Sequence, residues 1–336
     1  MESLLTTYAI NGFGRIGKLA LRVLIERNED VAFINDPVGN PESHAHLLEF
    51  DSIHDRWAEK ISFNKSSVII NGKVIKVFNY NNIIKLPSSE ADVIIDCTGK
   101  FKTENEVNSY NQIKTKKVIV SSAIPSELGL NLVYGVNHGL YDKDMHYVIS
   151  ASSCTTNCLA PIIKVLHEQV GIKHGSYTTI HNATNTQTLV DRPSKDLRRS
   201  RSALTNLIPS TTNSASAITQ IYPDLLDKLT GHAVRVPVLN SSLTDCCFEM
   251  KRETSSSEIN ALFREASFSN LKNILGYEKR PLVSSDYKGD ERSAIIDALS
   301  TVVINKTQVK VYAWYDNEFA YTHRVIDLAI MAGNSL

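Results

Sequence analysis

The sequence lacks a long apolar run and an overall excess of either charge. Its 336 residues contain 36 Lys plus Arg and 36 Asp plus Glu, so the formal net charge is zero. Without a basic excess we expect no nucleic-acid partner. No apolar stretch reaches membrane-spanning length, and the N-terminus lacks a signal-peptide pattern, so we also expect no membrane insertion.

Cysteine is scarce and its count is odd. The five cysteines (Cys97, Cys154, Cys158, Cys246 and Cys247) argue against a disulfide framework and for a reducing cytoplasm. Cys154 and Cys158 would share one helix face, but no second ligand pair completes a zinc site, so we expect no metal. Repeats and low-complexity tracts are also absent, and the length suffices for two domains with sizeable cores.

A glycine-rich turn lies close to the N-terminus. A short apolar run, 6–10, predicts a buried strand, and Gly12, Gly14 and Gly17 follow it in a GxGxxG pattern that opens a helical pattern. The first two glycines permit a tight turn and the close approach of a pyrophosphate, and Gly17 permits packing of the helix on the strand. This context predicts a dinucleotide-binding site.

The next predicted strand, 31–34, ends at Asp36, at the distance that such a fingerprint requires. A carboxylate there accepts hydrogen bonds from the adenosine ribose and repels a 2′-phosphate, so we expect NAD rather than NADP. The alternative is an aspartate that merely caps a turn.

Further strand-like runs follow at 67–70, 74–78, 93–97 and 117–121. Thr98, Gly99 and Ser121 lie at the carboxyl ends of the last two, the edge where open parallel sheets bind ligands. Asn71-Gly72 predicts a hairpin, so the sheet is not expected to be purely parallel.

Cys154 opens a second apolar-periodic run, which predicts a helix to about Gly171. A helix N-terminus favours a thiolate by up to about 2 kcal/mol, or about 1.5 pKa units, which would lower a thiol pKa to about 7. A stronger nucleophile needs a base, and His181, at the end of the strand-like run 176–181, is the candidate. The alternative is a small buried residue at a helix start.

A polar segment, 182–202, follows and is rich in arginine. Arginine suits oxyanions, so we interpret the segment as an anion site near the nucleophile; the alternatives for a basic loop are a solvated face or a nucleic-acid contact. Beyond it we expect strands at 233–238, 243–250, 294–297, 300–305 and 308–314, and helices at 256–266 and 321–331.

The fold class expected from these elements is α/β. It would comprise a Rossmann-type, doubly wound NAD-binding domain, 1–152, to which the C-terminal helix, 318–336, returns. An α+β catalytic domain with a mixed or antiparallel sheet would occupy 153–317.

The chain closely resembles the glyceraldehyde-3-phosphate dehydrogenase family over essentially its whole length. The resemblance rests on INGFGRIG from Ile10, SSCTTNCLAP from Ser152, TTIH ending at His181, HAVRVP around Arg235 and WYDNE from Trp314. It implies an NAD-dependent aldehyde dehydrogenase that oxidises glyceraldehyde 3-phosphate through a thioester on Cys154, with His181 as the base. It also implies a cytoplasmic homotetramer.

The resemblance further implies roles for individual residues. Thr184 and Arg235 match positions that hold the substrate phosphate. Ser153, Thr155, Arg198, Thr212 and Asn213 match the site of the attacking anion, although the family usually has glycine at the last position. Cofactor contacts match Gly12, Gly14, Arg15, Ile16, Gly17, Asp36, Thr98, Gly99, Ser121 and Asn317, the last of these binding the nicotinamide amide. The family's basic residue on the adenine side has no counterpart in 79–82.

Several runs (TNTQ, KDLRR, GHAVRVPVLN and SLTDC) look like the subfamily associated with an arsenic efflux permease (ArsJ-associated). In that subfamily arsenate replaces phosphate, and the permease exports the product, 1-arseno-3-phosphoglycerate. The resemblance thus implies arsenate detoxification with such a permease as functional partner. The alternatives are an ordinary glycolytic enzyme, an erythrose-4-phosphate dehydrogenase and a cofactor-bound regulator without turnover.

Overall fold

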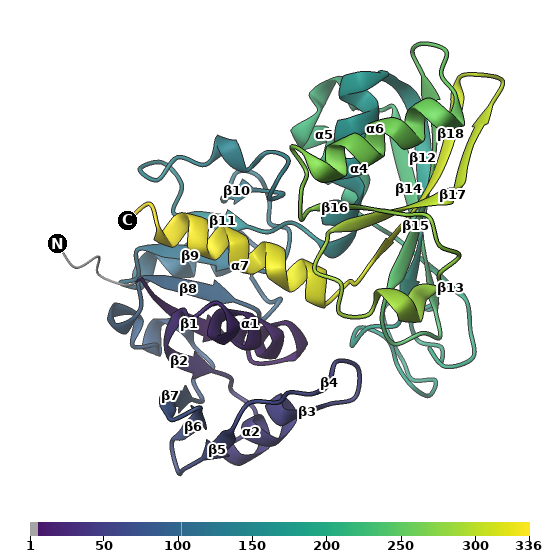
Figure 1. The fold of residues 1–336 in the computed structure, drawn as a ribbon. Coiled ribbons are helices and arrows are strands. Elements are labelled where there is room, and N and C mark those ends of the chain that lie inside the picture. Colours follow the sequence, from purple (N-terminus) through teal and green to yellow (C-terminus); the bar gives the residue numbers. More distant parts are fainter. Residues whose placement is uncertain (1–5, 102) are drawn as a thin grey trace. The chain divides into compact units, whose positions relative to one another are not determined.

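The computed structural model describes residues 6–101 and 103–336, which fall into two compact units. The first comprises Met1–Tyr134, His138–Ser152 and Thr322–Leu336, and the second comprises Gly135–Asn137 and Ser153–Tyr321. Figure 1 shows each unit as a sheet with helices packed on it. In the described part of the chain, no helix is both long and apolar enough to cross a membrane.

The first unit contains a nine-stranded sheet in the order β10-β11-β9-β8-β1-β2-β7-β6-β5. Neighbouring strands are parallel from β10 to β7, and β6 and β5 add an antiparallel edge. The predicted hairpin joins β6 and β7, with Asn71 and Gly72 at φ of 51° and 85°. The strands are β1 (Thr7–Asn11), β2 (Asp30–Asn35), β5 (Ile61–Phe63), β6 (Ser67–Ile70), β7 (Lys73–Phe78), β8 (Val93–Asp96), β9 (Lys117–Val120), β10 (Leu130–Asn131) and β11 (Val148–Ser150); β3 (Phe50–Asp51) and β4 (Asp55–Arg56) form a separate hairpin.

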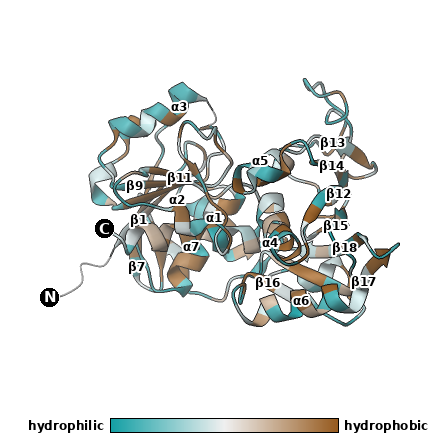
Figure 2. Cartoon of the chain, turned by 90° about the horizontal axis from the view of Figure 1, so that it is seen from above, coloured by the Kyte–Doolittle hydropathy of each residue, from teal (hydrophilic) through white to brown (hydrophobic). Residues whose placement is uncertain are grey.

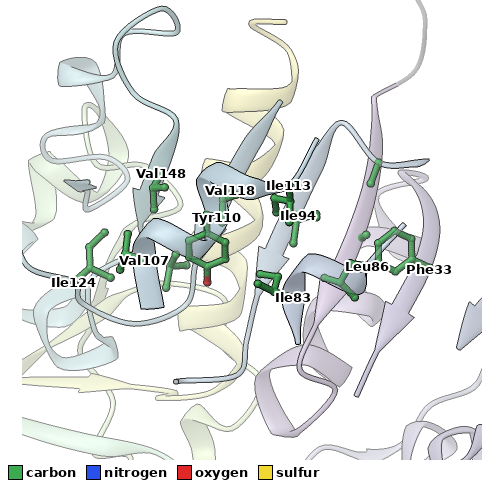
Figure 3. Packing of buried hydrophobic residues seen from close by; sticks show 13 residues of the cluster. Phe33, Ile83, Leu86, Ile94, Val107, Tyr110, Ile113, Val118, Ile124 and Val148 are labelled. Carbon is green, nitrogen blue, oxygen red and sulfur yellow. The ribbon is translucent and has the colours of Figure 1, made fainter. Parts of the chain in front are cut away.

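Helices cover both faces of this sheet. On one face, a Cβ at Gly17 of α1 (Arg15–Glu26) would lie 3.4 Å from the Ile10 side chain, and a Cβ at Gly333 of α7 (Phe319–Gly333) would lie 2.7 Å from the Tyr8 hydroxyl. On the other face, Ile94 and Val118 pack with Tyr110 from the short helical segment after α3 (Glu104–Asn108), as Figure 3 shows. The predicted doubly wound, Rossmann-type arrangement is therefore confirmed. The remaining helices here are α2 (Pro41–Glu49) and the short 3₁₀ helices η1 (Ile83–Lys85), η2 (Ser88–Glu90), η3 (Ser109–Gln112) and η4 (His138–Leu140).

Hydropathy follows this layering. In Figure 2 the strand β9 is largely hydrophobic, whereas α3, on the outside of the sheet, is largely hydrophilic. Strands of a parallel sheet are covered on both faces, so each is largely apolar. Accordingly, all four residues of β8 and of β9 are buried.

The second unit contains a seven-stranded sheet in the order β13-β14-β12-β15-β18-β17-β16. Two pairs in it, β14–β12 and β17–β16, are parallel and the other four are antiparallel, which confirms the predicted mixed sheet. Along β15 every second residue is buried, from Ser242 to Met250, because helices cover one face. The strands are β12 (Ile172–Asn182), β13 (Ile208–Ser210), β14 (Leu229–Val236), β15 (Ser242–Met250), β16 (Leu275–Glu278), β17 (Ala294–Ile304) and β18 (Gln308–Tyr315); the helices are α4 (Cys154–Gln169), α5 (Ser214–Ile221), α6 (Ser256–Phe268), η5 (Pro223–Leu225) and η6 (Ser284–Tyr287).

One local prediction was wrong. The two strands expected at 294–297 and 300–305 are one strand, β17, with a register shift between Asp297 and Val302. The carboxylate of Asp297 accepts hydrogen bonds from the N–H groups of Leu299 and Ser300, which bulges the strand without ending it. Helices α2 and α5 were not anticipated.

Candidate active site and cofactor site

Cys154 is the first residue of α4. Ser153 caps this helix, since its hydroxyl accepts a hydrogen bond from the N–H of Thr156 at 3.1 Å. Ser152, just before the cap, has φ of 55°, a conformation that few non-glycine residues adopt. Such strained backbone often accompanies a functional side chain.

His181 reaches Cys154 from the end of β12. Its Nε2 lies 3.5 Å from the Cys154 Sγ, within hydrogen-bond reach of a thiol. The predicted nucleophile and base are therefore adjacent, although 27 residues separate them in sequence. Cys158, one helical turn further along α4, is buried and bonded to the Thr244 hydroxyl instead.

The second ring nitrogen of His181 has two polar neighbours. Its Nδ1 lies 2.9 Å from the carbonyl oxygen of Asn182 and 2.5 Å from Nη1 of Arg235, the residue paired with His181 across β12 and β14. With a proton on Nδ1, both this N–H and the Arg235 N–H, which lies 3.2 Å from the same oxygen, would donate to the Asn182 carbonyl, and Nε2 would be free to accept the thiol proton. Burial and the Arg235 charge lower the pKa of His181 to about 3, so the imidazole is neutral near pH 7.

The expectation that the helix start would lower the pKa of Cys154 was wrong. Burial raises the pKa of the Cys154 thiol, and the positive charge of Arg235 only partly opposes this. The desolvation of the sulfur outweighs the helix terminus, because a thiolate loses more on leaving water than a partial charge restores. The resting pair is thus a neutral thiol beside a neutral imidazole.

Arg199 is half-buried, whereas Arg198 is exposed. Arg199 Nη1 donates to the Thr186 hydroxyl at 3.1 Å, and that hydroxyl lies 2.9 Å from the Thr184 hydroxyl. The charge of Arg199 also helps to lower the pKa of both His181 and Arg235. Arg198 is exposed and is bonded through its backbone N–H to Asp196. The sequence analysis missed Arg199, because two adjacent arginines in a loop carry no signal of which one points inward.

A second group of hydroxyls lies at the N-termini of α4 and α5. Ser153 and Thr212 are both bonded to Ser214, at 3.4 and 3.2 Å, so Ser214 joins two of the predicted anion residues. The Thr155 hydroxyl is instead buried against the Tyr315 hydroxyl at 3.1 Å. Asn213 has φ of −99°, which any residue adopts, so the usual glycine is not needed there.

The glycine loop of the first unit fits a pyrophosphate. A Cβ at Gly12 would lie 2.6 Å from the backbone nitrogen of Thr98, and one at Gly17 would lie 2.1 Å from the carbonyl oxygen of Gly12. Gly14 caps α1 with no side-chain hydrogen bond, and the space around its missing Cβ is open. The free N–H groups at this helix N-terminus are a ready anion site.

Other predicted cofactor residues lie at the same strand ends. The Asp36 carboxylate accepts hydrogen bonds from the N–H groups of Phe13 and Val38, at 2.7 and 2.9 Å, which fixes its orientation. Arg15 is paired with Asp51 at 2.5 Å, and Ile16 is half-buried in the first turn of α1. Thr98 is bonded to Asp96, Gly99 has φ of 64°, and the Ser121 N–H donates to the carbonyl oxygen of Asp96.

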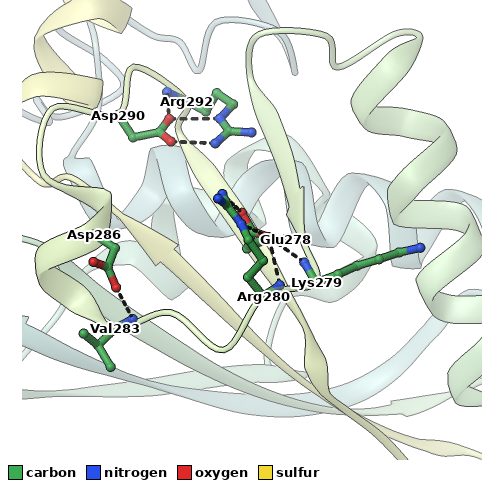
Figure 4. A network of polar contacts seen from close by, with 7 residues as sticks. All are labelled: Glu278, Lys279, Arg280, Val283, Asp286, Asp290 and Arg292. Carbon is green, nitrogen blue, oxygen red and sulfur yellow. Dashed lines mark hydrogen bonds and ion pairs between the residues drawn. The ribbon is translucent and has the colours of Figure 1, made fainter.

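Asn317 lies in the second unit, beside a buried aspartate. Its Oδ1 accepts a hydrogen bond from the Ser242 hydroxyl at 3.4 Å. The neighbouring Asp316 accepts four: from the Asn240 side chain, from the N–H groups of Glu318 and Phe319 at the start of α7, and from the Gly289 N–H. Gly289 belongs to the segment between β16 and β17, which local ion pairs such as Asp290–Arg292 hold together (Figure 4).

Two family models match the chain. That described as the NAD binding domain of glyceraldehyde 3-phosphate dehydrogenase matches residues 6–104, and that described as its C-terminal domain matches residues 153–317. The chain belongs to the glyceraldehyde-3-phosphate dehydrogenase family. It is therefore an NAD-dependent oxidoreductase, and NAD is its cofactor.

Named members of the glyceraldehyde-3-phosphate dehydrogenase family are similar throughout. Glyceraldehyde-3-phosphate dehydrogenase 3 of Nostoc sp. is 51% identical over 331 residues, which cover 97% of this chain and 98% of that protein. Glyceraldehyde-3-phosphate dehydrogenase 1 of Bacillus cereus is 45% identical, with the same coverage. The enzyme of Geobacillus stearothermophilus is 44% identical and covers 95% of this chain and 96% of its own length.

Proposed function

We propose that this protein oxidises glyceraldehyde 3-phosphate to an acyl phosphate or acyl arsenate through a thioester on Cys154. The observation that carries the proposal is the 3.5 Å contact between Cys154 Sγ and His181 Nε2 at the start of α4. A thiol that can pass its proton to an adjacent base is a suitable nucleophile for an aldehyde carbon. A neutral imidazole is required for this step, and burial with the Arg235 charge keeps His181 neutral.

In the proposed reaction His181 moves protons at each stage. Cys154 Sγ bonds to the aldehyde carbon while its proton passes to His181 Nε2, which returns it to the new oxyanion. His181 then takes the hydroxyl proton as hydride leaves the carbon, and the thioester forms. NAD supplies the hydride acceptor when bound. The N–H groups at the start of α4 and the imidazolium would stabilise the oxyanion.

Two anion subsites follow from the arrangement of cations and hydroxyls. Arg235 contacts His181, and Arg199 is linked to Thr184 through the Thr186 hydroxyl; we assign the substrate's phosphate to Thr184, Arg199 and Arg235. Ser153, Thr212 and the N-terminus of α5 would receive the attacking oxyanion. We leave Arg198 and the Thr155 hydroxyl out of this assignment, because the first is exposed and the second is bonded to Tyr315.

The acceptor would be phosphate or arsenate. Both are tetrahedral oxyanions of equal charge, and a site of hydroxyls and helix N–H groups has no contact that only one of them could make. We propose that arsenate detoxification, with an arsenic efflux permease as partner, is a role that this site permits. Glycolysis with phosphate uses the same residues. In either role we propose a homotetramer that works in the cytoplasm.

The experiment is NAD reduction by purified protein with glyceraldehyde 3-phosphate and each anion in turn. We expect both anions to support the reaction and phosphate to compete with arsenate. Arsenate should carry it to completion, because acyl arsenates hydrolyse, whereas phosphate should allow equilibrium. No reduction with either anion would overturn the function. Faster reduction of NAD with erythrose 4-phosphate, in water alone, would favour that alternative substrate.

The arsenic role has a separate test in cells. Arsenate tolerance should rise only when this protein and an arsenic efflux permease are present together, because the permease must remove the product. Tolerance conferred by this protein alone would contradict the arsenic role and leave the dehydrogenase activity standing.

A further inference from the structure

A chain of buried side-chain hydrogen bonds crosses the carboxyl edge of the first unit's sheet. Asn35, at the end of β2, donates from Nδ2 to Asn11 Oδ1 at 2.8 Å. Asn11, at the end of β1, donates from Nδ2 to Asp96 Oδ2 at 2.7 Å, and Asp96 ends β8. All three side chains are at least 95% buried, with exposed fractions of 2%, 5% and 1% respectively.

Both ends of this chain hold loops that leave the sheet edge. At one end Asp96 Oδ1 accepts from the backbone N–H and the hydroxyl of Thr98, at 3.0 and 2.7 Å. At the other end the Asn35 side chain accepts from the N–H of Tyr80 at 2.9 Å and donates to its carbonyl oxygen at 3.0 Å. Asn35 also immediately precedes Asp36. The chain therefore links the loops after β2, β7 and β8.

The two ends of this hydrogen-bond chain fix the direction of each hydrogen bond in it. The N–H of Tyr80 can only donate, so the Asn35 oxygen must face it and the Asn35 amide must face Asn11. Asn11 in turn must offer its oxygen to Asn35 and its amide to Asp96. Every partner of the Asp96 carboxylate is a donor, so both of its oxygens must accept, which only the ionised form does fully.

We propose that Asp96, Asn11 and Asn35 form one positioning unit for the cofactor, in which ionised Asp96 sets the direction of the hydrogen bonds and thereby holds the Thr98 and Tyr80 loops in their binding geometry. The inference rests on the proposed cofactor role of this edge. It assigns a function to Asn11, Asn35 and Asp96, which do not themselves belong to the proposed cofactor contacts. Tyr80 gains a role too: its half-exposed ring is stacked on Phe78 at 5.6 Å and offers a flat surface beside Asp36.

This unit has a pH dependence of its own. Burial raises the pKa of Asp96 to about 6, against the opposing hydrogen bonds from Thr98 and Asn11. The titratable groups that face it are Cys97, the residue that follows Asp96, and Tyr110 from η3; burial raises the pKa of both, so they stay neutral in this range. β1 contributes the uncharged Asn11. Protonation of Asp96 would place a hydrogen between two donors and break one link.

The test measures NAD binding to the whole protein by calorimetry, together with kcat and KM for NAD. We expect Asp96→Asn to weaken NAD binding about tenfold near pH 7.5, the loss expected for one hydrogen bond to a charged group, with little change in kcat at saturating NAD. Wild-type binding should weaken as the pH falls from about 7 to about 5, and the variant should show no such change. The double variant Asp96→Asn with Asn35→Ala should lose little more NAD affinity than either single variant, because one break disrupts the whole hydrogen-bond chain.

The matched control is Asp92→Asn, at the opposite end of the same strand. The Asp92 carboxylate accepts from the Thr7 N–H and is paired with Lys116. Loss of its charge therefore perturbs the start of the strand but not the hydrogen-bond chain at Asp96. Wild-type NAD binding that is independent of pH from about 5 to 7 would overturn the proposal without any variant. Equal losses of NAD affinity in Asp92→Asn and Asp96→Asn would also overturn it. A protein that binds NAD but oxidises no glyceraldehyde 3-phosphate would sink the proposed function and leave this proposal standing.

Discussion

At the residue scale, sequence motifs located the reactive side chains but not their protonation. The position of Cys154 at a helix start and its pairing with His181 were both predicted, because motif spacing carries them. The direction of the Cys154 pKa shift was wrong, because burial is a property of the folded surroundings. Arg199 was missed for the same reason: which of two adjacent arginines is half-buried depends on the loop.

The first prediction concerns the nucleophile. Cys154→Ser should reduce NAD reduction by at least about a thousandfold, because a serine hydroxyl beside a neutral imidazole is a much weaker nucleophile than a thiol. NAD binding should stay within about twofold, because the glycine loop belongs to the other unit. The measurements are turnover and calorimetric NAD affinity. Cys158→Ser is the control: its partner is the Thr244 hydroxyl, so turnover should persist.

The second prediction concerns cofactor choice. Asp36→Ala should remove about 1–3 kcal/mol of preference for NAD over NADP, the contribution of a charge-assisted hydrogen bond. Asp36→Asn separates charge from structure, because an amide can still accept from the N–H of Phe13 or Val38 but repels no phosphate. The measurement is the ratio of kcat/KM with NAD to kcat/KM with NADP in each variant. An unchanged ratio in both variants would show that another residue selects NAD.

The third prediction concerns the pH dependence of Cys154 alkylation by iodoacetamide. Burial and Arg235 hold the pKa of His181 near 3, so the rate should show no inflection in the ordinary histidine range. It should instead rise toward alkaline pH, since burial raises the pKa of the thiol. Arg235→Gln should raise the pKa of His181 and move its inflection in the alkylation rate to higher pH, because a positive charge next to Nδ1 is lost. A wild-type inflection between about pH 6 and 7 would contradict this account.

At the scale of elements, the predictable parts were those with a strong apolar period or a glycine signal. The runs that became β8 and β9 were apolar except for Asp96 and Lys117 at their ends, and Asn71-Gly72 marked its hairpin. α2 was missed although Asn40, Pro41 and Ser43 form a recognisable N-terminal cap, with reciprocal hydrogen bonds between Asn40 and Ser43. α5 buries little besides Ile218, so its short pattern gives no apolar stripe.

The fourth prediction concerns the start of α7. Asp316→Ala should lower the stability of the protein by about 3 kcal/mol, because it removes a helix cap and leaves the buried Asn240 amide and the Gly289 N–H without their acceptor. Asp286→Ala is the control. Asp286 caps the exposed turn at Val283 in the segment of Figure 4, so its loss should cost less than about 1 kcal/mol. Thermal unfolding of both variants measures the difference.

At the scale of the whole molecule, the two units carry different buried charges. The first unit contains His323, whose pKa burial and two arginines lower to about 4, and Asp96, whose pKa burial raises to about 6. The histidine's contribution to stability is full above pH 6.5 and falls as the pH drops toward 4. The aspartate's contribution is full below its unfolded value and is lost as the pH rises through 6. The two effects are of similar size, about 3 kcal/mol each, so these two groups nearly offset each other on acidification.

The second unit has no such balance, and this gives the fifth prediction. The pKa of His181 is lowered to about 3 by burial and Arg235, so its contribution is present above pH 6.5 and falls by at most about 5 kcal/mol as the pH drops toward 3. Between these pH values the histidine is protonated in the unfolded chain but stays neutral in the folded unit. On acidification from about pH 7 to about 4.5, amide hydrogens of β12 and β15 should therefore lose exchange protection before those of β1 and β8. His181→Asn should keep that protection although it removes turnover, because the variant has no group to protonate. An equal loss in both units, or a loss that His181→Asn leaves unchanged, would show that acid lability comes from other groups.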